Sequence, residues 1–163
     1  MFQVTGNPIL RNAKWSTKDG KPTQGDYAIF PLCESDERNN LRFIGTAFFI
    51  CTNGLFVTAK HVVMDGRGER PIDPLTAVQF IENNQYILRP VLSVSTNGSD
   101  VAIGALAPGM HRGTSEPLIN SILSLTTKIP APGSIVTTFA YPKSFVQDQA
   151  SIREMHFRTA PER

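Results

Sequence analysis

Cysteine is scarce in this sequence, and so are the clusters of residues that bind metals. The two cysteines, Cys33 and Cys51, form no Cys-x-x-Cys pair and have no matching Cys/His cluster for zinc. We therefore predict no metal site and no cofactor. Each cysteine lies in or beside an apolar run, which favours two buried free thiols, with a disulfide between them as the alternative.

Strong charge and long apolar runs are also missing. The net charge is +2 and the basic residues are scattered, so no nucleic-acid partner is expected. No apolar run approaches the roughly 20 residues that cross a bilayer, and the first residues lack the pattern of a secretory signal. We predict no membrane partner and take a cytoplasmic location as the default, while the sequence leaves the oligomeric state open.

Glycine and proline, by contrast, are plentiful, with 12 of each, and hydrophobic residues make up 40% of the chain. This composition is typical of a globular chain with many turns and few long helices. Six apolar segments follow one another at short, regular spacing, which predicts an all-β fold with a small closed antiparallel β-barrel. These predicted strands are residues 27–32, 43–50, 55–58, 77–81, 86–95 and 101–106.

Composition also divides the chain into segments. We predict an N-terminal extension at residues 1–26, a first β-barrel at 27–106, a linker rich in proline and glycine at 107–117, and a partial second β-barrel at 118–163. The strands expected in that second part are residues 118–127, 135–141 and 149–158. In the first barrel, Pro90 interrupts a predicted strand, which favours an edge or a β-bulge at that point.

Two polar residues stand where predicted strands end or begin. Asn53-Gly54 predicts a tight hairpin turn, and the strand that follows it leads to His61, expected at a semi-buried place beside the core. Asp100 directly precedes the last strand of the first barrel, after the segment 95–99, which we interpret as a turn instead of a glycosylation site at Asn97. Taken singly, the two residues also fit a structural histidine and an ordinary turn residue.

Together these motifs resemble the chymotrypsin-like, or trypsin-like, serine peptidase superfamily. The motif TAKH ends at His61 and the motif DVA begins at Asp100, which is similar to the family's Thr-Ala-x-His and Asp-hydrophobic-Ala patterns. The segment GTAFF at 45–49 resembles the strand that precedes the catalytic histidine. Residues 132–142 resemble the opening of the family's second barrel, although Ala140 stands where a glycine is usual.

The resemblance implies a serine endopeptidase domain of two β-barrels that acts on polypeptides. His61 would be the general base, and Asp100 would orient it and stabilise its charged form. His111 and His156 lack this context, and we expect both at the surface.

The family's nucleophile motif, Gly-x-Ser-Gly, is absent from the sequence. The nearest fragment is Gly133-Ser134, but Ile135 follows it and no flanking glycine completes the motif. We prefer a truncated peptidase that lacks the segment with the serine and is inactive alone. The alternative is a non-catalytic peptidase-like binding module for a peptide ligand.

Overall fold

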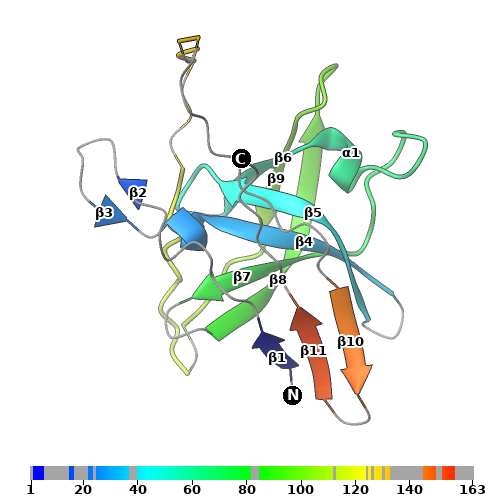
Figure 1. Ribbon diagram of the computed structural model, residues 1–163, viewed down its shortest axis with the longest axis vertical. Helices are drawn as coiled ribbons and strands as arrows, with labels where there is room; N and C mark the ends of the chain where they lie inside the picture. Colours follow the sequence, from blue (N-terminus) through cyan, green and yellow to red (C-terminus); the bar gives the residue numbers. More distant parts are fainter. Residues whose placement is uncertain are drawn as a thin grey trace.

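The strands of this chain close into a β-barrel, as the computed structural model shows (Figure 1). The structure describes residues 2–5, 15–16, 22–23, 25–36, 40–81, 85–111, 113–123, 125, 127–129, 131–132, 145–149 and 152–156. The barrel strands are β4 (Ile29–Ser35), β5 (Leu41–Phe49), β6 (Leu55–Thr58), β7 (Leu75–Ile81), β8 (Gln85–Thr96) and β9 (Ala102–Leu106). They pair antiparallel in the closed order β4-β5-β6-β9-β8-β7, so the predicted all-β fold with a closed six-stranded antiparallel barrel is confirmed.

The long strand β8 closes the barrel because its first half pairs with β7 and its second half pairs with β9. Residues 85–90 pair with β7, and residues 91–96 pair with β9, with a shift of register between Val91 and Ser93. Pro90 lies at this change of partner, where a residue without an N–H interrupts no continuous series of strand hydrogen bonds. Its carbonyl accepts a hydrogen bond from Ala107 N at 2.9 Å. The prediction of a bulge near Pro90 is therefore confirmed.

The interior of the barrel is filled by aromatic and aliphatic side chains. Phe30, Phe49 and Phe56 are fully buried, and the ring centroids of Phe30 and Phe49 lie 4.4 Å apart. Val63 and Met64, a few residues after the last residue of β6, complete this cluster. Burying side chains of this size contributes roughly 1.5–3 kcal/mol each to folding.

Strand β4 is buried on both faces, unlike a strand with one solvated side. Its outer face carries Ile29 and Cys33, which pack with Leu41 and Val78 in a second, smaller cluster outside the barrel. Leu123 packs against this cluster. Burial raises the pKa of the Cys33 thiol to about 12. Cys33 is buried as predicted, and Cys51 is only half-buried; both are free thiols.

A buried polar cluster lies at the opposite end of the barrel from His61, where the start of β6 meets the end of β9 at Gly54 and Leu106. Arg89 is only 2% exposed, and its guanidinium donates to Gln79 Oε1 at 2.6 Å and to Asn120 Oδ1 at 2.7 Å. It also donates to the Ala107 carbonyl at 2.8 Å, and burial lowers the pKa of Arg89. These described acceptors are all neutral oxygens, so hydrogen bonds compensate the buried charge here.

The described residues of the segment after the barrel cross this end without forming a strand, contrary to the strand predicted at 118–127. Among its described residues, Leu118 N donates to Gly109 O at 2.8 Å, Asn120 N to Thr52 O at 3.2 Å and Leu123 N to Phe49 O at 2.9 Å. Leu118 thus bonds within its own segment, while Asn120 and Leu123 bond to the β5–β6 hairpin at single positions. These described residues make no continuous ladder with a neighbouring strand, which explains why the prediction was wrong. The predicted strand at 135–141 lies outside the described residues.

Strands near both ends of the chain form a separate small sheet. β11 (Ile152–His156) falls within the predicted strand at 149–158 and pairs antiparallel with β10 (Phe145–Gln149). β1 (Phe2–Thr5) runs parallel to β11, so the N-terminal region contributes a strand that its composition did not indicate (Figure 1). β10 also contacts β5 of the barrel.

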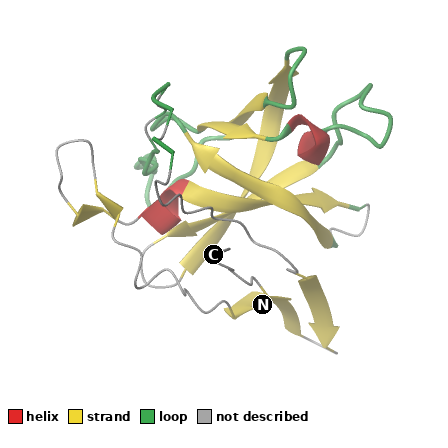
Figure 2. Cartoon of the chain, turned by 45° about the horizontal axis from the view of Figure 1, so that its top comes forward, coloured by secondary structure: helices red, strands yellow, loops and turns green. Residues whose placement is uncertain are grey.

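The remaining described elements are short. β2 (Trp15–Ser16) pairs with β3 (Pro22–Thr23), and the 3₁₀-helix η2 (Gly25–Ala28) leads into β4. Strands dominate the described chain, in which α1 (Lys60–Val63) and η2 are the two helical segments (Figure 2). In the part of the chain that the structure describes, neither is long and apolar enough to cross a membrane.

The polar cluster predicts a measurable loss of stability on substitution of Asn120. Asn120→Ala removes an acceptor of the buried Arg89 and the donor to Thr52 O at 2.7 Å. Because buried polar groups then lose their partners, the free energy of unfolding should fall by about 1–3 kcal/mol. Urea unfolding followed by circular dichroism measures this. Thr127→Ala, at an exposed position of the same segment, is the control and should change stability by no more than about 0.5 kcal/mol.

Candidate active site

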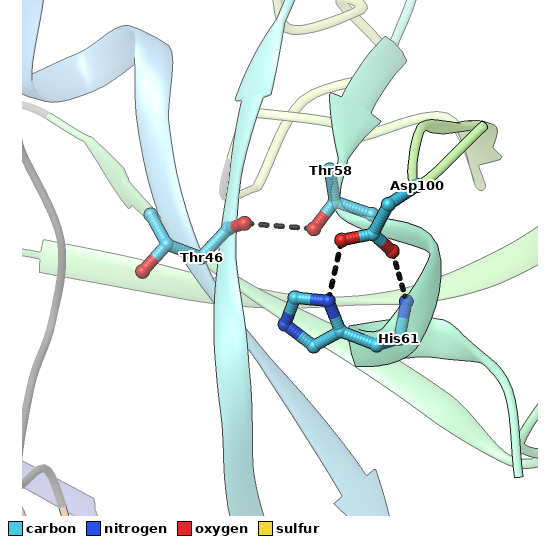
Figure 3. Close-up of polar contacts among 4 residues, drawn as sticks. All are labelled: Thr46, Thr58, His61 and Asp100. Carbon is cyan, nitrogen blue, oxygen red and sulfur yellow. Dashed lines mark hydrogen bonds and ion pairs between the residues drawn. The ribbon is translucent and has the colours of Figure 1, made fainter.

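His61 is presented by a single helical turn that follows β6. Strand β6 ends at Thr58, whose hydroxyl donates to the Thr46 carbonyl of β5 at 2.8 Å (Figure 3). Ala59 then leads into α1, in which Val63 turns into the barrel core and is fully buried. The side chain of His61, on the same turn, stays 72% exposed. The expectation of a semi-buried histidine was therefore wrong, because the buried face of this short turn belongs to Val63.

Asp100 lies at the same rim of the barrel, just before β9, the strand that pairs with β6. The turn before it is held by Asn97, whose Oδ1 accepts from Ser99 N at 3.1 Å and from the Ser99 hydroxyl at 2.6 Å. The predicted turn at 95–99 is therefore confirmed for residues 97–99, while residues 95 and 96 belong to β8. Strand β9 begins two residues after Asp100, and its first residue, Ala102, pairs with Thr58. The end of β6 and the start of β9 are therefore neighbours.

The two predicted residues meet through hydrogen bonds to both carboxylate oxygens. His61 Nδ1 lies 2.8 Å from Asp100 Oδ2, and His61 N donates to Asp100 Oδ1 at 3.0 Å (Figure 3). Lys60 N also donates to the Asp100 carbonyl, at 3.3 Å. Asp100 thus holds the backbone of α1 as well as the imidazole, a double contact that its position in the sequence did not reveal.

These contacts change the electrostatics of the carboxylate. The hydrogen bond from the His61 side chain lowers the pKa of Asp100 below its usual value of 3.8, and the His61 backbone N–H lowers it further. Desolvation opposes both effects only in part. With 61% of the Asp100 side chain exposed, solvent screens the pair, so its contribution to stability is small.

The geometry determines which ring nitrogen of His61 is available for chemistry. An ionised carboxylate only accepts hydrogen bonds, so the short contact places the proton of the neutral ring on Nδ1. Nε2 then carries a lone pair, and in Figure 3 it points away from Asp100. Among the residues that the structure describes, none hydrogen-bonds to Nε2. An imidazole held in this tautomer can take a proton from an approaching donor at Nε2.

The other candidate residues lie apart from this pair. His111 is exposed, as predicted, on the segment after the barrel. The side chain of His156 and the whole fragment Gly133-Ser134 lie outside the described part of the structure. Within the described residues, no group of three or more His, Cys, Asp or Glu side chains could hold a metal ion.

Two contacts next to His61 in the chain escaped the sequence analysis. One is the Thr58–Thr46 hydrogen bond, which ties the end of β6 to β5 just before His61. The other is the close approach of Val62 to Gly45. A glycine inside an apolar strand is a recognised sign that another part of the chain approaches closely.

Comparison with protein-family models finds no family that matches this chain, and a search of curated proteins finds no match either. The resemblance to serine peptidases therefore stays a hypothesis that rests on the residues themselves and on their geometry.

The pair predicts a pH dependence that can be measured in this chain. The Asp100 carboxyl should titrate below 3.8, and in His61→Ala its midpoint should rise because the largest stabilising hydrogen bond is lost. Because the pKa of Asp100 is lower in the folded chain than in the unfolded chain, the pair adds stability above about pH 4, the pKa range of free carboxyls. This added stability is lost as the pH falls through the folded-state pKa. Carbon-13 NMR of the carboxyl gives both midpoints. His111→Ala should leave the Asp100 midpoint unchanged, and equal midpoints in wild type and His61→Ala would contradict the described pair.

Proposed function

We propose that this chain is part of a trypsin-like serine endopeptidase domain, in which His61 is the general base and Asp100 its orienting partner. The observation that carries the proposal is the 2.8 Å contact between His61 Nδ1 and Asp100 Oδ2 at the rim of a closed antiparallel barrel. The motifs TAKH and DVA place the two residues just after β6 and just before β9, which are adjacent strands. This arrangement also supports the peptidase proposal.

The proposed chemistry follows from the tautomer. A serine hydroxyl is a weak nucleophile until a base removes its proton. In the proposed reaction, Nε2 of His61 takes that proton as the serine oxygen attacks the carbonyl carbon of a peptide bond, and later gives it to the leaving amine. Asp100 keeps the proton on Nδ1 and stabilises the imidazolium that forms. A polypeptide is the proposed substrate.

The proposal also assigns the remaining segments. The first barrel comprises β4 to β9, and the segment crossing its end leads toward a second barrel, to which β10 and β11 would belong. The serine and the N–H groups that stabilise the tetrahedral intermediate would come from a Gly-x-Ser-Gly loop, a motif that this sequence does not contain.

That missing motif favours a second candidate function. A peptidase-like barrel without a nucleophile would bind a peptide ligand and release it unchanged. In that case the His61–Asp100 pair would stabilise the rim of the barrel or contact the ligand, without any proton transfer.

The coding sequence beyond Arg163 separates the two candidates. A Gly-x-Ser-Gly motif there supports the peptidase, whereas an immediate stop codon supports the binding module. In a chain extended through that motif, Asp100→Asn should lower kcat about 10⁴-fold, and His61→Ala by at least as much, because the base then loses its tautomer or is absent. Hydrolysis of a fluorogenic peptide library measures this. His111→Ala, at an exposed histidine outside the pair, should leave kcat unchanged.

The 163-residue chain itself should neither hydrolyse peptides nor react with a serine-directed phosphonate, because its sequence lacks the Gly-x-Ser-Gly motif that would supply the nucleophile. Mass spectrometry after phosphonate treatment provides the measurement. Stoichiometric labelling of a serine would show that the nucleophile is present after all and would overturn this expectation.

A further inference from the structure

Strand β5 carries a glycine where the chain needs space rather than an unusual backbone conformation. A Cβ atom built on Gly45 would lie 2.4 Å from Cγ1 and 2.6 Å from Cγ2 of Val62, closer than real Cβ atoms approach other atoms. Its φ angle lies outside the left-handed region, so an L residue could adopt the backbone conformation. Because glycine weakens a strand interior, this close contact explains its place in β5.

Val62 is the residue directly after His61, so the contact acts on the turn that carries the imidazole. A helix of four residues does not hold its own conformation in water, and its place depends on what it packs against. Val63 anchors α1 in the barrel core, while Val62 rests on the backbone of β5 at Gly45. Asp100 completes the attachment through the His61 N–H.

We propose that Gly45 is a positioning residue that sets the place of His61 relative to Asp100 by allowing Val62 to lie directly against β5. A methyl group at position 45 pushes Val62 and α1 away from the strand. Asp100 does not follow, because it lies two residues before β9, whose first residue, Ala102, is paired with Thr58. The imidazole–carboxylate contact lengthens as a result. The catalytic meaning of this effect rests on the proposed function, whereas the geometry does not.

The test uses the 163-residue chain and NMR signals of the pair. In wild type, the nitrogen-15 shifts of the neutral His61 ring should place its proton on Nδ1, and the Asp100 carboxyl should titrate below 3.8. In Gly45→Ala, the ring signals should lose this preference for Nδ1 and the Asp100 midpoint should rise toward 3.8. Val62→Ile, which enlarges the same contact with Gly45 intact, should shift both signals in the same direction and provides the test if Gly45→Ala does not fold.

Rescue and controls separate positioning from a general loss of stability. Val62→Ala in the Gly45→Ala background removes the two clashing methyl groups and should restore both signals. Gly66→Ala has no atom within 4 Å of the added methyl and should change nothing. Leu106→Ala creates a cavity at the opposite end of β9, so it should lower the free energy of unfolding by about 2–5 kcal/mol and leave the pair intact.

The possible outcomes distinguish this inference from the proposed function. A folded Gly45→Ala chain with unchanged signals would overturn the role of Gly45 and leave the peptidase proposal untouched. Absence of the pair's signals in wild type would overturn both. If the NMR changes occur as expected and the extended chain shows no hydrolysis, the role of Gly45 stands and the peptidase proposal fails.

Discussion

The pairing of β6 with β9 is the constraint on which the candidate site depends. It sets Thr58 opposite Ala102, so the chain leaving β6 and the chain entering β9 meet at one rim of the barrel. Two residues 39 positions apart thereby come within 2.8 Å. Neither residue contributes much to the fold by itself, because both side chains are largely exposed. The barrel supplies the rigidity, and the pair occupies a place that the barrel determines.

The two ends of the barrel are filled in different ways. Near His61, apolar side chains follow the strand into the interior, with Val63 and Met64 beside the aromatic cluster. At the other end, Arg89 is buried among amide and carbonyl oxygens and lies over the ring of Phe49, 5.7 Å from its centroid. A buried charge is expensive unless its hydrogen bonds are made, so this end requires one particular arrangement of Gln79 and Asn120. That requirement holds the segment after the barrel in place.

Much of the barrel was predictable because its signals are local. Apolar runs bounded by turn residues identify the strands, and Asn53-Gly54 identifies the hairpin, where Gly54 has a φ of 103°. The strand predicted at 118–127 was wrong for a reason that is not local. Its apolar residues fit a strand, yet its backbone groups bond to the barrel at Thr52 and Phe49. Periodicity cannot say which partner a backbone will choose. The same limit applies to β1, whose partner lies near the other end of the chain.

The sequence by itself determined the strands of the barrel, the turns between them, and the choice of His61 and Asp100 as the candidate site residues. These features depend on residue type and on neighbours along the chain. Only the tertiary structure decided that both carboxylate oxygens of Asp100 bind His61, that the imidazole is exposed, and that Gly45 makes room for Val62. Such features depend on distances between segments that are remote in sequence, and those distances exist only once the barrel has closed.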